Sequence, residues 1–229
     1  MNEPITVFIW DLLVKNFPIY CEKVTGFWLT EPLNALTNLA FLIGAYYLYK
    51  FIRINRVKSH LSIFLVGLMV AVGLGSLSWH VHRSEVTLLL DRLPIYIFFS
   101  FVIYFAIQTL TKNKIFTIAV SALLAIIYYV FFTYIPGINV FYGLLRFVFA
   151  FIILATLNFL IKREYGSEYN LIIPLTIFAA ALIFRTLDLF VCPLFPLGTH
   201  FLWHIFIAVG MYMGSILVLR LNTKMSNET

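Results

Sequence analysis

Charged residues are scarce in this chain. Only 11% of its 229 residues are Asp, Glu, Lys or Arg, whereas 62% are hydrophobic and the mean hydropathy is +0.96. A soluble domain of this length does not offer enough interior positions to bury so much apolar surface. The composition therefore excludes an ordinary soluble protein and predicts an integral membrane protein. The net charge of +6 does not indicate a nucleic acid partner, because its distribution along the chain is typical of membrane loops.

Long polar stretches are also missing between the apolar segments. Crossing the hydrocarbon layer as a helix takes about 20 apolar residues. Seven runs approach that length, at roughly 31–52, 60–82, 86–109, 115–135, 139–161, 169–187 and 199–220. Because a bilayer leaves open strand edges without hydrogen-bond partners, these runs must be helices. We therefore predict an all-α membrane protein, a seven-transmembrane helix bundle that forms a single domain over residues 1–229.

Positive charge gathers in alternate loops and predicts the orientation. The loops after the first, third and fifth runs and the C-terminal tail are basic, with Lys50, Arg53, Arg56, Lys58, Lys112, Lys114, Lys162, Arg163, Arg220 and Lys224. The opposite loops carry almost no net positive charge. By the positive-inside rule, residues 1–30 form an extracytoplasmic N-terminal segment and residues 221–229 a cytoplasmic tail.

Cysteine is nearly absent, with only Cys21 and Cys192 in the chain. The predicted topology places both on the non-cytoplasmic side, which is usually oxidising, so a disulfide is one interpretation. Two unpaired buried thiols are the other, because the sequence does not give the Cα separation that a bridge requires.

Ionisable side chains inside the apolar runs are few and fall at one depth. His80 lies near the outer end of the second run, Asp91 near the outer end of the third, and His200 and His204 near the outer end of the seventh. Such residues are costly in a membrane and usually functional. Three separate helices therefore bring polar groups together in the outer leaflet.

These residue types suit a catalytic zinc site. Residues four apart share one helix face, so His200 and His204 can point at one object, as can Ser76 and His80. Three neutral imidazoles bind Zn²⁺ and leave a fourth position for water. Asp91 could then accept the proton of that water, and Ser76 could hold a developing oxyanion. The alternative is that the histidines form hydrogen bonds to neighbouring helices without a metal.

The remaining charged residues in or near the runs have less specific interpretations. We expect His82 to be a loop histidine, because it cannot share a face with His80. Arg185 and Asp188, three residues apart, are expected to form a structural ion pair. The pattern assigns no role to Arg146.

Two segments resemble a known family. The stretch G-S-L-S-W-H at 75–80 with Asp91, followed by H-F-L-W-H at 200–204, resembles the alkaline ceramidases, in a superfamily with adiponectin-type receptors and Per1-like proteins. The segment 20–41 is similar to the Cys-Glu and Glu-x-x-Asn-x-x-x-Asn opening of ceramidases.

The resemblance implies a role for each matching residue. His80, His200 and His204 would be the zinc ligands, Asp91 would deprotonate the zinc-bound water, and Ser76 would help to hold the oxyanion. Cys21 and Cys192 would be the disulfide pair of the family.

Some members of the family also hold calcium near the N-terminus, and this site is incomplete here. Glu22 and Glu31 match the family, but Ile19 and Val24 stand where it has Asp and Asn. Calcium needs six to eight oxygen ligands. We therefore expect Glu22 and Glu31 to have structural roles.

Residues and resemblance together predict a zinc-dependent intramembrane amidohydrolase. It would cleave the amide bond of ceramide or a related N-acyl lipid, among membrane lipids, to a fatty acid and a long-chain amino alcohol. Its active site would face the non-cytoplasmic side. A zinc-containing seven-helix lipid receptor or sensor with little or no turnover remains the alternative, because metal-ligand geometry does not separate the two.

Overall fold

A computed structural model describes residues 19–23, 29–57, 59–134, 142–166 and 171–228, with side chains omitted at 129–134, 142–147 and 224–228. This part of the chain forms helices and contains no strand. Most of the predicted N-terminal segment 1–30 lies outside the described residues, as does the side chain of Arg146. The predicted all-α class is confirmed for the described chain.

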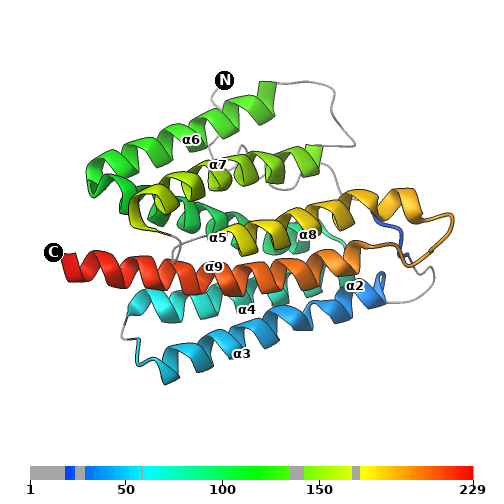
Figure 1. Cartoon of the computed structure of the whole chain (residues 1–229). Helices are drawn as coiled ribbons and strands as arrows, with labels where there is room; N and C mark the ends of the chain where they lie inside the picture. Colours follow the sequence, from blue (N-terminus) through cyan, green and yellow to red (C-terminus); the bar gives the residue numbers. More distant parts are fainter. Residues whose placement is uncertain (1–18, 24–28, 58, 135–141, 167–170, 229) are drawn as a thin grey trace.

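The helices run side by side as a bundle (Figure 1). Their bounds are α2 Pro32–Thr37, α3 Leu39–Ile54, α4 His60–Val81, α5 Glu85–Thr111, α6 Lys114–Tyr134, α7 Tyr142–Tyr165, α8 Ile172–Val191 and α9 His200–Glu228. Within the described residues, five segments are long and apolar enough to cross a membrane: α2 with α3, α4, α5, α8, and α9 up to Thr223. The chain is thus an integral membrane protein by length and composition, and α6 and α7 lie where the other two runs were predicted.

The α4–α5 turn is short because its sequence caps the second helix. The Ser84 hydroxyl accepts a hydrogen bond from the Thr87 backbone N–H at 3.2 Å, and the Thr87 hydroxyl accepts one from the Ser84 N–H at 3.0 Å. This reciprocal pair satisfies two N–H groups at the start of α5. The chain therefore reverses within a few residues, and Asp91 returns to the depth of His80.

Gly75 allows α4 and α5 to approach closely at the site. A Cβ atom at Gly75 would collide with the backbone carbonyl oxygen of Leu90, which is rigid helix backbone. The next residue on α4 is Ser76, and the next on α5 is Asp91. The glycine therefore sets the helix separation at which these two polar side chains meet.

We predict that Gly75→Ala destabilises the bundle by about 1–3 kcal/mol, because the added methyl group must push α5 away. Gly67→Ala is a matched control on the same helix, since a Cβ there meets no atom within 4 Å. Thermal unfolding of both variants in lipid nanodiscs measures the difference. Equal melting temperatures for the two variants would contradict the close-approach explanation.

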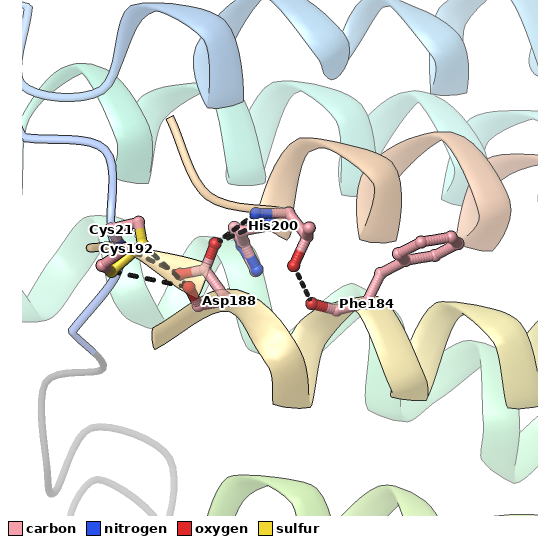
Figure 2. The surroundings of a disulfide bond; sticks show 6 residues. Cys21, Phe184, Asp188, Cys192 and His200 are labelled. Atoms are coloured by element: carbon pink, nitrogen blue, oxygen red, sulfur yellow. Dashed lines mark hydrogen bonds between the residues drawn. A yellow bond between two sulfur atoms is a disulfide. The ribbon is translucent and has the colours of Figure 1, made fainter. Parts of the chain in front are cut away.

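A disulfide joins the N-terminal segment to the end of α8. Cys21 and Cys192 are bonded, with their Cα atoms 5.4 Å apart (Figure 2). The bridge spans 171 residues of sequence. The predicted disulfide is confirmed, and it fixes residues beside Cys21 against the end of the bundle that carries the histidines.

The basic loops lie at the other end of the bundle. The α3–α4 turn, the α5–α6 turn and the C-terminal ends of α7 and α9 gather at one end, whereas the end of α8 and the start of α9 lie at the opposite end (Figure 1). The disulfide is at that opposite end, because Cys192 directly follows α8. The separation of basic loops from the histidines along the helix axes agrees with the predicted arrangement. The orientation in a membrane stays a prediction.

Candidate metal centre

Three buried histidines converge at one end of the bundle. His80 is in the last turn of α4, His200 begins α9, and His204 follows one helical turn later. Their exposed fractions are 1%, 1% and 2%. One ring nitrogen from each residue lies within 4.8 Å of the other two, an arrangement that could hold a metal ion. The convergence expected from the sequence is therefore present.

The Nδ1 atom of His80 is held by Glu31. One carboxylate oxygen of Glu31 lies 2.5 Å from this atom and also accepts a hydrogen bond from the Asn34 amide at 3.3 Å. The other oxygen forms an ion pair with Arg83 at 3.2 Å. With Nδ1 engaged, the Nε2 atom of His80 is the one that remains for a ligand in the cluster.

Glu31 immediately precedes the first candidate span and is itself buried. Burial raises the pKa of Glu31 to about 7, although the nearby charge of Arg83 opposes the shift. A backbone hydrogen bond also joins Glu31 to the end of α4: the Glu31 N–H donates to the His80 carbonyl oxygen at 3.1 Å.

Thr37 fixes the ring of His204. The Thr37 hydroxyl lies 3.0 Å from Nδ1 of His204 and also 3.0 Å from the carbonyl oxygens of Leu33 and Asn34. Because a hydroxyl has one proton and directs it to a carbonyl, its oxygen accepts from the Nδ1–H of His204. This assignment leaves the Nε2 lone pair of His204 for a metal.

His200 is held by stacking and by its backbone. The ring of Tyr20 stacks on the His200 ring with centroids 3.8 Å apart and an interplanar angle of 21°. Burial raises the pKa of the Tyr20 phenol, so Tyr20 is neutral at physiological pH. The Nδ1 atom of His200 is buried and has no hydrogen-bond partner among the described residues.

The donor set fits zinc. Nitrogen ligands at about 2.0–2.1 Å from a tetrahedral Zn²⁺ lie roughly 3.3 Å apart. Ring nitrogens within 4.8 Å of one another reach that geometry with shifts of the order of an ångström. Imidazoles whose other nitrogen is already hydrogen-bonded are the usual protein ligands of this ion.

Asp188 positions the start of α9. It was expected to form an ion pair with Arg185, but its carboxylate accepts three backbone hydrogen bonds (Figure 2). The N–H of Thr199 donates at 2.7 Å and that of His200 at 2.8 Å to one oxygen, and the N–H of Cys21 donates at 2.9 Å to the other. A carboxylate at a helix N-terminus is stabilised there by the unsatisfied N–H groups and the helix dipole.

Gly198 makes room for this carboxylate. Its φ of +64° lies in the left-handed region, and a Cβ atom there would collide with the Asp188 carboxylate oxygen and with the side chain of Cys21. Position 198 therefore requires glycine for two reasons: its left-handed backbone conformation, and the lack of space for a Cβ atom.

We predict that Asp188→Ala destabilises the protein by about 3 kcal/mol or more, because it leaves three backbone N–H groups without their acceptor. The rise in melting temperature caused by added zinc should also shrink, since the start of α9 carries His200. Thermal unfolding with zinc and with a chelator measures both effects. Glu164→Ala, at an exposed carboxylate on α7, is the control; a zinc-induced rise as large in Asp188→Ala as in this control would contradict the positioning role.

Asp91 and Ser76 lie beside the histidines. The side chain of Ser76 lies beside the Asp91 carboxylate. Asp91 lines one pocket together with His80, His200 and His204. The structure therefore brings together all the site residues that the sequence singled out, on α4, α5 and α9.

Glu22 has the structural role that we expected. Its two carboxylate oxygens accept hydrogen bonds from the backbone N–H groups of Leu33 at 2.6 Å and Asn34 at 2.8 Å, at the start of α2. Both Glu22 and Glu31 thus use their oxygens in contacts with the protein, Glu31 with His80 and Arg83. His82, the residue after α4, is exposed and outside the cluster, as predicted.

Sequence reasoning did not assign to the site several residues that complete it. Glu31 and Thr37 orient two of the histidines, Tyr20 stacks on the third, and Arg92 and Arg185 line the same pocket. Glu31 and Thr37 could have been suspected, because buried metal-binding histidines need an outer hydrogen-bond partner. No pattern in the sequence indicated which of the available polar residues would supply it.

Comparison with known proteins decides the family. A family model described as Ceramidase matches residues 20–229, nearly the whole chain. The chain belongs to the ceramidase family. In the comparison with curated proteins, no match was found. Membership implies a hydrolase that acts on the amide bond of ceramide, a lipid substrate. The matched region includes all three histidines, Asp91, Ser76 and both cysteines.

Proposed function

We propose that this ceramidase-family protein is a zinc-dependent hydrolase that cleaves the amide bond of ceramide or a related N-acyl lipid within the membrane. The observation that carries the proposal is the cluster of His80, His200 and His204, buried at one end of an apolar bundle with Asp91 in the same pocket. The products are a fatty acid and a long-chain amino alcohol.

The three imidazoles are the proposed zinc ligands. When bound, zinc supplies a Lewis acid for the amide carbonyl and a source of nucleophilic water at neutral pH. Glu31 and Thr37 hold the Nδ1 atoms of His80 and His204, so that their Nε2 atoms would be left to bind the ion. His200 is positioned by the hydrogen bond from its backbone N–H to the Asp188 carboxylate and by the stacked Tyr20 ring.

Asp91 is the proposed general base and acid. Its carboxylate lines the same pocket as the histidines, and the side chain of Ser76 lies beside it. Asp91 takes a proton from the attacking water and later delivers it to the leaving amine. Ser76 can turn its hydroxyl from Asp91 toward the substrate oxygen and donate to the oxyanion as it forms.

An apolar cavity beside the site suits the acyl chain. A small apolar pocket lies among α5, α7, α8 and α9, with Phe98, Phe178, Ile207 and Met211 in its lining. Phe178 packs against Trp203 with ring centroids 6.4 Å apart, and Trp203 lines the histidine pocket. We propose that the acyl chain extends from the histidines toward this apolar pocket.

The same proposal includes the topology. Residues 1–229 form one ceramidase-like domain of seven spans, in which α6 and α7 supply the two spans beyond the five candidates. The basic loops at the opposite end support a cytoplasmic C-terminus and an N-terminus outside, which would direct the histidine pocket toward the non-cytoplasmic side.

We predict that His204→Ala abolishes release of fatty acid from ceramide and that Asp91→Asn lowers kcat by about 10²–10⁴-fold, because each removes an essential participant. Ser76→Ala should lower kcat by about 10²-fold with little change in KM, because its donor acts mainly in the transition state. Fatty acid release from purified protein with a panel of N-acyl lipids measures these effects.

His82→Ala is the matched control for this series, since it removes an exposed histidine two residues from His80. It should keep wild-type turnover. A chelator should stop the reaction and added zinc restore it. Lipid that binds to the wild-type protein but is never hydrolysed would contradict the enzyme and support the zinc-containing sensor.

A further inference from the structure

We propose that Arg83 takes the place of a calcium ion in this chain, by holding the Glu31 carboxylate in position against His80. The zinc centre then assembles without calcium, although the family resemblance places a calcium site around Glu22 and Glu31. This inference rests on the proposed function, because His80 is one of the proposed zinc ligands. It adds a positioning residue and a metal requirement that the proposed function leaves open.

The oxygen atoms that calcium would need are missing or already engaged. Ile19 stands where the family has aspartate, and its exposed side chain offers no oxygen. Both carboxylate oxygens of Glu22 accept backbone hydrogen bonds, and both oxygens of Glu31 contact side chains of the protein. The buried amide oxygens of Asn34 and Asn38 have no hydrogen-bond partner among the described residues. Two such oxygens are too few for calcium, which takes six to eight.

Glu31 is a buried carboxylate that requires a cation beside it. Its side chain is 1% exposed, and an isolated carboxylate is very costly in such a place. The Nη1 atom of Arg83 lies 3.2 Å from one of its oxygens, so the charge is paired. A guanidinium is always charged and is covalently attached, whereas calcium has to be supplied from solution. Arg83 is therefore a permanent counter-ion for this carboxylate.

The α4–α5 turn fixes the position of Arg83. This residue directly precedes Ser84, the N-cap residue of α5, whose hydrogen bonds hold the turn. The guanidinium carbon of Arg83 lies 4.7 Å from the ring centroid of Trp79 and 5.7 Å from that of Tyr20. Aromatic faces attract a cation and give it a defined place. The guanidinium thus reaches Glu31 from a short, capped turn and is held there by two rings.

Arg83 and His80 contact different oxygens of the Glu31 carboxylate. One oxygen lies 2.5 Å from the Nδ1 atom of His80, and the other lies 3.2 Å from Arg83. Because a carboxylate is planar, fixing one oxygen restricts rotation of the group and keeps the other oxygen on the imidazole. A carboxylate on the outer nitrogen of a zinc-binding histidine orients its ring and strengthens it as a ligand. Arg83 therefore acts on the zinc ligand through Glu31.

Thermal unfolding of the full chain in phosphatidylcholine nanodiscs tests the calcium claim. The protein is stripped of metal with a chelator, the chelator is removed, and calcium alone or zinc alone is added. We expect zinc to raise the melting temperature and calcium to leave it unchanged, because an ion stabilises the folded state only where it binds. Zinc alone should also restore hydrolysis of ceramide, and added calcium should not increase it. A calcium-induced rise in melting temperature would overturn the inference.

Zinc affinity tests the positioning role. Competition with a chromogenic chelator measures the Kd for zinc of the wild type, R83Q, R83K and K23Q. R83Q should raise this Kd about 10-fold, the lower end of the effect of an outer partner on metal affinity. R83K should keep part of the affinity, because lysine keeps the charge but not the planar fork. K23Q is the matched control: it removes an exposed positive charge that also acts on Glu31, and it should bind zinc as the wild type does.

A double-mutant cycle tests whether Arg83 acts through Glu31. E31Q alone should weaken zinc binding by about 10- to 100-fold. The double variant R83Q/E31Q should bind zinc no more weakly than E31Q, because no carboxylate is left for Arg83 to position. Losses that add in the double variant would refute the coupling.

Zinc binding as tight in R83Q as in the wild type would overturn the inference and leave the proposed function standing. If R83Q does not fold, the Kd of R83K and the addition of calcium to the wild type decide the inference: wild-type affinity in R83K, or stabilisation by calcium, would overturn it. A wild-type protein that binds no zinc would overturn the proposed function and the positioning role together.

Discussion

The structure depends on holding three imidazole rings with their lone pairs directed at one point inside an apolar bundle. Burying polar rings is costly unless each has a partner. His80 has Glu31, His204 has Thr37, and His200 is stacked on Tyr20. These partners all lie in residues 20–37, ahead of or within the first short helix. The N-terminal part of the chain is therefore a scaffold for ligands that come from α4 and α9.

A second set of contacts ties this scaffold to the last two helices. The Asp188 carboxylate accepts hydrogen bonds from the backbone N–H groups of both Cys21 and His200. The disulfide to Cys192 holds Cys21 in place. Gly198 is the residue that lets the chain turn beneath the carboxylate. Because one buried side chain contacts the N-terminal segment and the first residue of α9, the position of His200 depends on the disulfide region as well as on helix packing.

The apolar runs, the histidine convergence and the disulfide could be predicted because each depends on a strong local or chemical signal: length in hydrocarbon, the cost of a buried imidazole, and two cysteines on one side. Other features could not. The break at Asn38 between α2 and α3 lies inside the first predicted span, 31–52, where no proline or glycine indicates it. α5 and α8 are apolar on most sides, so periodicity does not reveal that Arg92 and Arg185 turn toward the histidines. The contact of Glu31 with His80 arises from packing between distant segments, which no spacing encodes.

The most direct test of the account is metal analysis combined with X-ray absorption at the zinc edge, on protein purified in detergent without chelator. The account predicts about one zinc per chain, with a first shell of imidazole nitrogens and one oxygen at about 2.0–2.1 Å, and loss of the metal in His204→Ala. Protein that is folded and disulfide-bonded but binds no zinc, or a first shell without imidazole, would contradict it.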